Sequence, residues 1–132
     1  MIYLDSTVFL NGSLCVDEKG ENARKLLTDV QSGKTPAATS ALTYDEVSWV
    51  TKKHKDFNAA LEAGEALLGM PNLTILPVDG DILRQAHELS KTYELHPRDA
   101  IHAACALSNG IHTVVSTDKD FDRVKEIKRH QP

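Results

Sequence analysis

The sequence has few of the residues that stabilise disulfide-linked or zinc-linked scaffolds. Of its 132 residues only two are cysteines, Cys15 and Cys105, and neither belongs to a CxxC pair or a Cys/His cluster. Neither a disulfide framework nor a structural zinc site is therefore suggested, and the reducing cytoplasm is the expected location. No apolar run approaches the roughly 18 residues that span a bilayer, and Asp5 stands where a signal peptide carries basic charge. We expect neither a membrane segment nor a secretory leader.

Aromatic residues and positive charge are also scarce. Phe, Trp and Tyr make up 5% of the chain, so no row of aromatic side chains for stacking bases is evident. The 15 Lys and Arg residues are outnumbered by 19 Asp and Glu, which gives a formal net charge of −4. This balance excludes a protein that binds nucleic acid through overall basicity but leaves local basic clusters open.

Short β-rich runs alternate with longer amphipathic patterns, with no internal repeat and no linker-like stretch. This alternation is typical of βα units packed around a parallel sheet. We predict one domain over residues 1–132, a three-layer α/β/α sandwich whose mostly parallel central sheet has four to five strands. The expected strands cover residues 2–4, 36–40, 73–78 and 112–116, with a short fifth near Ile127. The expected helices cover 21–30, 42–53, 57–68, 82–93 and the segment from Pro97 to Gly110.

Several large side chains are expected to pack rather than to act. Leu61 and Leu68 are predicted on the inner side of their helix, and Trp49 in the core rather than stacked on a base. His102 and Cys105 lie one turn apart on a helix of small residues, where packing explains them better than a thiol–imidazole pair does.

Four acidic residues stand where predicted strands end or predicted helices begin. Asp5 directly follows the first strand, Glu46 lies shortly after the second, and Asp118 stands just beyond the fourth. Asp99 lies in the first turn of the helix that Pro97 opens. In open α/β sheets the carboxyl ends of the strands line the crevice where ligands bind. We therefore expect the four carboxylates to meet at one edge of the sheet.

Each of these positions also has an ordinary structural explanation. Thr43 and Glu46 match a capping box, in which the glutamate accepts a hydrogen bond from the backbone N–H of the threonine. Asp99 suits the positive end of a helix, and Asp118 suits a solvated turn. Asp5 is the hardest to explain in this way, because an apolar strand seldom ends on an acid without a reason. The shared edge favours a functional site over four coincidences.

Carboxylates gathered at one edge repel one another and lower stability unless something neutralises them. Mg²⁺ or Mn²⁺ does this well, since both prefer oxygen ligands and keep coordinated waters. Such ions activate water, orient a phosphate and stabilise the leaving oxygen, which indicates metal-assisted hydrolysis of a phosphodiester. If the acids crowd one another, Asn at Asp5 or Asp99 should raise the melting temperature in the absence of metal.

Four segments of the chain carry a family resemblance: LDSTVF, TYDE, HPRDAIHAACAL and STDKDF. In this order and spacing the sequence resembles a PIN domain, and in particular the VapC toxins of VapBC toxin–antitoxin pairs. The resemblance implies an α/β/α sandwich and a Mg²⁺- or Mn²⁺-dependent endoribonuclease, a hydrolase that cuts RNA phosphodiester bonds. It also implies a homodimer and an antitoxin protein that blocks the site.

The resemblance assigns catalytic and metal-binding roles to the acids and supporting roles to two hydroxyl residues. The acids are Asp5, Glu46, Asp99 and Asp118, with Asp120 as the alternative to Asp118 because members differ over which acid of this motif faces the metal. The hydroxyl residues are Ser6 and Thr117.

The sequence identifies the basic side chains that would bind RNA less clearly than it identifies the acids. Arg98, beside the third acid, together with Lys52 and Lys53, is a candidate phosphate contact. A further basic cluster covers residues 123–130. Surface ion pairs and solvated helix faces explain these residues equally well.

Two other interpretations stay open from the sequence alone. The same residues fit a housekeeping nuclease in RNA maturation, or a PIN-like module that binds RNA or protein without cleaving it. A pure binding module has no need to keep four mutually repelling carboxylates, which favours a nuclease.

Overall fold

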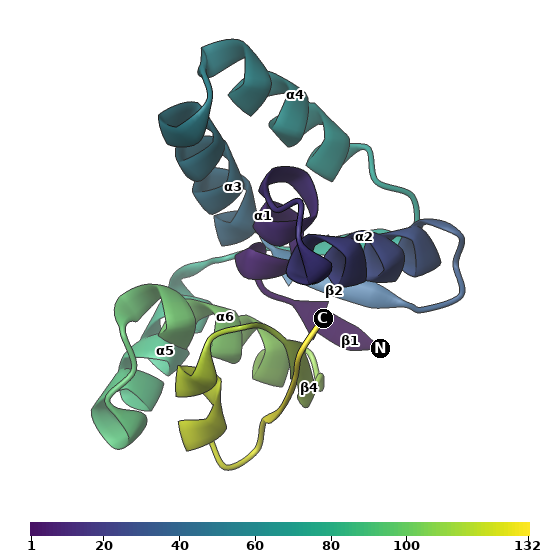
Figure 1. Cartoon of the computed structure of the whole chain (residues 1–132). Coiled ribbons are helices and arrows are strands. Elements are labelled where there is room, and N and C mark those ends of the chain that lie inside the picture. The colour runs from purple at the N-terminus through teal and green to yellow at the C-terminus, as the bar shows by residue number, and fades with distance from the viewer.

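A five-stranded parallel sheet forms the middle layer of the computed structural model, which describes residues 1–132 (Figure 1). Its strands are β1 (Ile2–Leu4), β2 (Ala37–Ser40), β3 (Leu73–Leu76), β4 (Thr113–Val115) and β5 (Lys128–His130). Their spatial order is β3-β2-β1-β4-β5, and every neighbouring pair is parallel. The predicted α/β class and the mostly parallel sheet are confirmed, and β3, which ends before Pro77, is an edge strand.

The chain changes direction around the central strand, β1. It runs outward through β2 to β3 and then crosses to β4 and β5 on the other side of β1. In doubly wound sheets a crevice opens at such a switch point, outside the carboxyl ends of the two strands concerned. These strands are β1 and β4, and their register pairs Leu4 with Val115. The residues that follow Leu4 and Val115 are therefore brought side by side.

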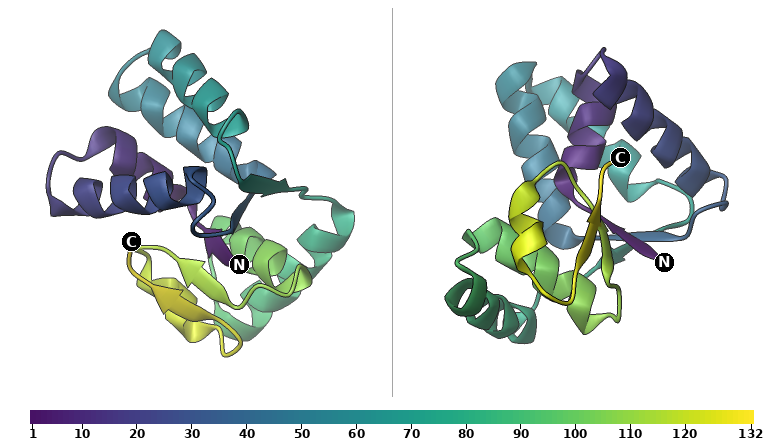
Figure 2. Two further views of the ribbon diagram at one scale, coloured as in Figure 1. Left: turned by 90° about the vertical axis from the view of Figure 1, so that its right-hand side faces the viewer. Right: turned by 60° about the horizontal axis from the view of Figure 1, so that its bottom comes forward.

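Helices cover both faces of the sheet (Figure 2). One face carries α1 (Ser6–Leu14), α2 (Glu18–Gln31), α3 (Ala41–His54) and α4 (Phe57–Leu68). The other face carries α5 (Gly80–Tyr93) and α6 (Pro97–Ser108), with the short 3₁₀ helix η1 (Lys119–Arg123) between β4 and β5. None of the helices combines the length and hydrophobicity of a membrane span.

Each face of the sheet has its own apolar cluster. Because successive side chains of a strand point to opposite faces, Tyr3 packs in the cluster under α5 and α6, and Leu4 in the cluster under α1 to α4. Helix α6 lies close to the sheet, since its alanines, among them Ala100 and Ala103, are fully buried and leave little side chain between the two. The first turn of α6 thereby reaches the carboxyl ends of the strands.

Three details of local structure differ from the sequence-based expectations. Helix α1 was not expected, because its sequence has no clear amphipathic period; burial of Val8 and Phe9 holds it in place. Leu61 and Leu68 are 49% and 61% exposed, because α4 packs mainly against α3 rather than on the sheet. Trp49 is 57% exposed on the same α3–α4 hairpin, which extends away from the sheet (Figure 1), so its predicted core position is wrong.

Candidate active site

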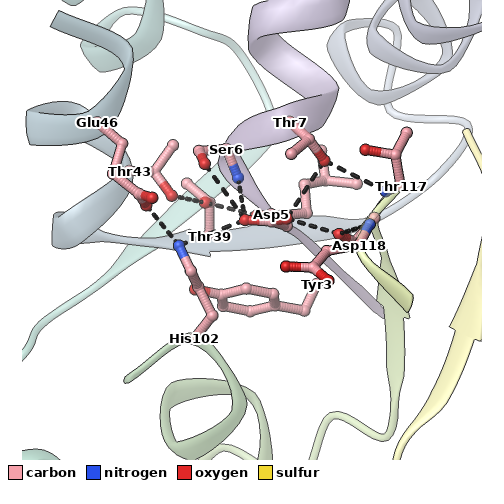
Figure 3. A network of polar contacts seen from close by, with 12 residues as sticks. Tyr3, Asp5, Ser6, Thr7, Thr39, Thr43, Glu46, His102, Thr117 and Asp118 are labelled. Carbon is pink, nitrogen blue, oxygen red and sulfur yellow. Dashed lines mark hydrogen bonds and ion pairs between the residues drawn. The ribbon is translucent and has the colours of Figure 1, made fainter. Parts of the chain in front are cut away.

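Asp5 lies at the carboxyl end of β1, at the switch point of the sheet. It directly follows β1 and is the N-cap of α1, and only 3% of the residue is exposed. Its Oδ1 accepts hydrogen bonds from the backbone N–H of Ser6 (2.6 Å) and from the Ser6 hydroxyl (3.3 Å). Its Oδ2 accepts hydrogen bonds from Ser116 Oγ (2.6 Å) and from Thr7 Oγ1 (3.2 Å) (Figure 3). Four donors therefore compensate a buried carboxylate and fix its direction.

His102 joins Asp5 to Glu46. Its Nε2 lies 2.5 Å from Oε1 of Glu46 and 3.4 Å from Oδ1 of Asp5, and its Nδ1 lies 2.6 Å from the Tyr3 hydroxyl (Figure 3). Burial lowers the pKa of His102, but the hydrogen bond with Glu46 and the negative charge of Asp5 outweigh burial and raise this pKa above its usual range. Burial raises the pKa of the Tyr3 phenol well above its ordinary value, so Tyr3 keeps its proton.

Asp99, Asp118 and Asp120 form a second group beside Asp5. Asp99 lies in the first turn of α6, one turn before His102, so both side chains point from one face of this helix. Asp118 follows β4 and caps η1 by accepting a hydrogen bond from the backbone N–H of Asp120 (2.9 Å). Burial, the charge of Asp118, a hydrogen bond with Asp118 and the charge of Asp5 together raise the pKa of Asp99 to about 7.

Two sets of ligand atoms thus line one edge of the sheet. The Asp5 cluster consists of Asp5, Glu46 and His102, and the Asp99 cluster consists of Asp99, Asp118 and Asp120. Within each cluster the atoms that can bind a metal lie within 4.8 Å of one another. Five of the six side chains offer carboxylate oxygens, which suits a hard divalent cation. The raised pKa of Asp99 indicates crowded negative charge that such a cation would relieve.

The sequence-predicted residues divide between this edge and the surface. The four acids and the alternative, Asp120, all come to the edge. Ser6 contacts Asp5 through its backbone N–H and its hydroxyl, whereas Thr117 contributes only its backbone N–H, which donates to Thr7 Oγ1 (3.4 Å). The hydroxyls that reach Oδ2 of Asp5 from outside the predicted set belong to Thr7 and Ser116.

The predicted phosphate contacts lie outside the acid clusters. Arg98 is exposed in the first turn of α6 and forms no ion pair. Lys52 and Lys53 are exposed in the last turn of α3, roughly 9 to 10.5 Å along the helix from Glu46 at the usual rise per residue. Within the basic cluster of residues 123–130, Arg123 pairs with Asp120 (3.4 Å) and Arg129 with Asp122 (2.9 Å).

The capping box expected at the start of α3 does not form. Helix α3 begins one turn earlier than that box requires, with Ser40 as its N-cap and no side-chain cap hydrogen bond. The Thr43 hydroxyl instead shares a hydrogen bond with Thr39 (2.7 Å), and Glu46 faces His102. The ordinary explanation of Glu46 is therefore wrong.

Sequence reasoning also missed the polar role of His102, which it assigned to packing. His102 is 1% exposed, yet both ring nitrogens have polar partners. The available signal was its position three residues after Asp99 on a helix of small residues, where the only large polar side chain on the buried face must find partners.

Several comparisons place this geometry among known proteins. The PIN domain model matches residues 2–127, and no curated protein sequence matches the chain. The chain is similar in structure to Mycobacterium tuberculosis VapC20, a sarcin–ricin-loop-cleaving toxin, with a TM-score of 0.82, 20% identity and 100% of each chain covered.

Two VapBC structures are also similar. VapBC2 from Rickettsia felis, bound to a DNA fragment from its promoter, matches with a TM-score of 0.74 and 18% identity over 99% of this chain and 98% of that one. VapBC-1 from nontypeable Haemophilus influenzae matches with a TM-score of 0.69 and 20% identity over 99% and 98%. From the family match over nearly the whole chain, supported by these shared folds, the chain belongs to the PIN domain family.

Proposed function

We propose that this chain is a cytoplasmic, divalent-metal-dependent endoribonuclease, the toxin of a type II toxin–antitoxin pair. The observation that carries the proposal is the meeting of Asp5, Glu46, Asp99 and Asp118, which come from four separate segments to one edge of the sheet. Membership of the PIN domain family and the likeness to VapC toxins support nuclease chemistry.

The donor set fits Mg²⁺ or Mn²⁺. Asp5, Asp99 and Asp118 would bind the metal, with Asp120 as the alternative to Asp118 and with Glu46 binding directly or through water. A bound ion of this kind supplies a Lewis acid that lowers the pKa of coordinated water and neutralises charge on a phosphate. The chain contributes fixed oxygen ligands: the donors around Asp5 hold its carboxylate in place before any metal arrives.

Hydrolysis at this site needs no covalent intermediate on the protein. Ser6 Oγ donates to Asp5, and its residue is 4% exposed. Burial raises the pKa of the Cys105 thiol to about 11, and Sγ faces the carbonyl of Pro77, so a nucleophilic thiolate is disfavoured there. Water is thus the nucleophile that the site favours.

The proposal includes protein partners as well as RNA. Several similar structures are VapBC complexes, which supports an antitoxin that covers the site. Tyr44, Trp49 and Phe57 are exposed on the α3–α4 hairpin, which supports a contact between two copies of the chain. Arg98, Lys52 and Lys53 are free to contact RNA phosphates. Light scattering and co-purification with the small protein encoded next to the toxin would test these partners.

An RNA cleavage assay tests the proposed activity. Purified protein is incubated with a mixture of structured and single-stranded RNAs in Mn²⁺ or in EDTA, beside Asp99→Asn. Asp45→Asn is the matched control, since Asp45 is an exposed neighbour of Glu46 outside both clusters. We expect cleavage in Mn²⁺ by the wild type and Asp45→Asn only. If nothing is cut, calorimetric titration with Mn²⁺ separates an unmet RNA requirement from a non-cleaving binding module.

The toxin role has a separate test from the chemistry. A housekeeping nuclease would have the same site, so expression of the wild type and of Asp99→Asn in cells separates the two interpretations. A toxin should arrest growth only when its carboxylates are intact, and co-expression of the adjacent small protein should restore growth. A wild-type chain that leaves growth unchanged would favour the housekeeping nuclease.

A further inference from the structure

Glu46 is held by a single contact that comes from the opposite side of the sheet. It lies on α3, in the layer of α1 to α4, and its only hydrogen-bond partner is His102 on α6, in the other layer. The Glu46 side chain is 14% exposed and has no lysine or arginine within ion-pair distance. Without His102 this carboxylate would have no contact that sets its direction toward Asp5.

His102 is in turn held on its other ring nitrogen. Tyr3 is fully buried, and its hydroxyl lies 2.6 Å from Nδ1, with the two rings at 66° to one another. Tyr3 belongs to β1, two residues before Asp5, so the strand that carries Asp5 also carries the support of His102. Figure 3 shows the chain of contacts from Tyr3 through His102 to Glu46, with Asp5 beside it.

The hydrogen positions in this chain follow from the chemistry of the partners. A carboxylate in its ionised form only accepts, and its contact with Nε2 is then the one that the Nε2–H tautomer of His102 donates. A phenolic hydroxyl can donate or accept, so Tyr3 satisfies Nδ1 whether or not that nitrogen carries a proton. The arrangement therefore does not depend on the charge of the ring.

From this geometry we infer that Tyr3 and His102 are positioning residues that aim the Glu46 carboxylate at the metal site. The inference rests on the proposed function and assigns roles to two side chains outside its set of acids. His102 has the ligand type and the distance to bind a metal itself. With its hydrogen on Nε2, however, that nitrogen has no lone pair to offer, and it acts through Glu46 instead. Partners that orient metal ligands in this way commonly change metal affinity by about 10- to 100-fold when removed.

Mn²⁺ affinity measured by calorimetry tests the inference without RNA. His102→Leu should weaken Mn²⁺ binding by roughly 10- to 100-fold, because Glu46 loses its only contact. His102→Gln should recover much of this loss, since its amide N–H can reach the place of Nε2–H. Tyr3→Phe keeps the buried ring and removes only the hydroxyl, and it should weaken binding by about 3- to 10-fold.

The control is Tyr93→Phe, since Tyr93 is on α5 and its hydroxyl meets Glu126, which belongs to neither acid cluster. All variants are compared for thermal unfolding in EDTA, so that a folding defect is recognised. Tyr3→Phe keeps the inference testable if His102→Leu does not fold. In cleavage assays the loss should appear as a higher half-saturating Mn²⁺ concentration, with the KM for RNA unchanged.

The imidazole ¹⁵N signals of His102 distinguish a positioning role from direct ligation of the metal. On addition of Mg²⁺ we expect Nε2 to keep its proton-bearing signal. Loss of that proton on metal binding would show His102 to be a direct ligand and would overturn the inference, as would wild-type Mn²⁺ affinity in Tyr3→Phe or in a folded His102→Leu. A wild-type chain that binds no Mn²⁺ would overturn the inference together with the proposed function. If metal binding depends on Tyr3 and His102 but no RNA is cleaved, only the proposed nuclease activity would be overturned.

Discussion

The two acid clusters differ in how the negative charge of their carboxylates is compensated. In the Asp5 cluster the carboxylates are satisfied by neutral donors and by an imidazole: Asp5 has four hydrogen-bond donors, and Glu46 has His102. In the Asp99 cluster, Arg123 pairs with Asp120 (3.4 Å), and the charge of His102 lowers the pKa of Asp99 without offsetting the causes that raise it. There the pKa of Asp99 is raised to about 7, with burial as the largest cause and Asp118 as the next.

Under the proposed function, this difference gives the two clusters different roles in one metal site. The Asp5 cluster is in place without metal, because its hydrogen bonds already offset the cost of burying charge. In the Asp99 cluster, burial and the charges of Asp118 and Asp5 disfavour the ionised form of Asp99, so its gain from a bound cation is larger. We therefore expect substitutions in the two clusters to have the same effect on RNA cleavage and on stabilisation by metal. We expect them to have opposite effects on the stability of the metal-free protein.

The largest expected effect is the loss of cleavage. Asp5→Asn and Asp99→Asn should each lower the rate of RNA cleavage in Mn²⁺ by about 10³-fold, because each removes a charged ligand from the site where transition-state charge is stabilised. Single-turnover assays at saturating RNA measure this. Loss of activity in one variant only would mean that the clusters do not form one centre.

The second effect is loss of stabilisation by metal. A ligand at 100 times its dissociation constant stabilises the folded state by about 2.7 kcal/mol, and the wild type should show a stabilisation of this order in excess Mn²⁺. Asp5→Asn and Asp99→Asn should both lose most of it. Thermal unfolding with and without Mn²⁺ gives the comparison, with Asp45→Asn as the variant that should respond like the wild type.

Substitutions in the two clusters should change the stability of the metal-free protein in opposite directions. Asp5→Asn should destabilise the fold by about 2 kcal/mol, since an amide keeps fewer of the four charge-assisted hydrogen bonds. Asp99→Asn should stabilise it by roughly 1 kcal/mol at pH 8, a value reduced by the partial solvent exposure of Asp99. Urea unfolding in EDTA measures both. If both substitutions changed the free energy of unfolding in the same direction, the two clusters would not differ in how their charge is compensated.

This expectation corrects the simpler one from the sequence, in which Asn at either position stabilises the metal-free protein. The hydrogen bonds from Ser6, Thr7 and Ser116 reverse the sign at Asp5 alone.

The pH dependence of stability should belong to the Asp99 cluster. The pKa of Asp99 is about 7 in the folded chain, against an ordinary value of 3.8, so between these values the folded state binds the extra proton. Stability without metal therefore falls as pH rises from about 4 to 7, and the advantage of Asp99→Asn over the wild type grows over the same window. His102, whose pKa is also raised, changes stability in the same direction in both proteins. Because the charge of Asp99 helps to raise the pKa of His102, the difference between the two proteins reports Asp99 together with its effect on His102.

The smallest expected effects lie outside both clusters. Lys52→Ala and Lys53→Ala should raise the KM for RNA by about two- to threefold, without altering Mn²⁺ affinity, because these exposed side chains can contribute only phosphate contacts. The effect should shrink as salt concentration rises. A change in Mn²⁺ affinity in either variant would place the end of α3 nearer the metal than the structure does.

Local patterns predicted most of the fold and the acids of the site. The ends of strands and the first turns of helices are set by nearby residues, so the positions of Asp5, Asp99 and Asp118 at one edge followed from the alternation of β and α segments. Helix α1 was missed because tertiary packing of Val8 and Phe9, rather than a local pattern, stabilises it.

The contacts that join the two layers were not predictable in the same way. His102 meets Glu46 across 56 positions of sequence and Tyr3 across 99, and no local pattern encodes such a meeting. Ser116, rather than its neighbour Thr117, supports Asp5, because the direction of a side chain at the end of β4 depends on the exact residue at which the strand stops.

The position of a bound Mn²⁺ ion tests the central claim, that the two clusters form one metal centre, most directly. Anomalous scattering from crystals grown with Mn²⁺ would locate the ion. The account predicts a peak at the carboxyl edge of β1 and β4, within about 2.5 Å of an oxygen of Asp5 and of an oxygen from the Asp99 cluster. Peaks confined to other surfaces of the protein, or no peak at this edge in crystals soaked to saturation, would contradict it.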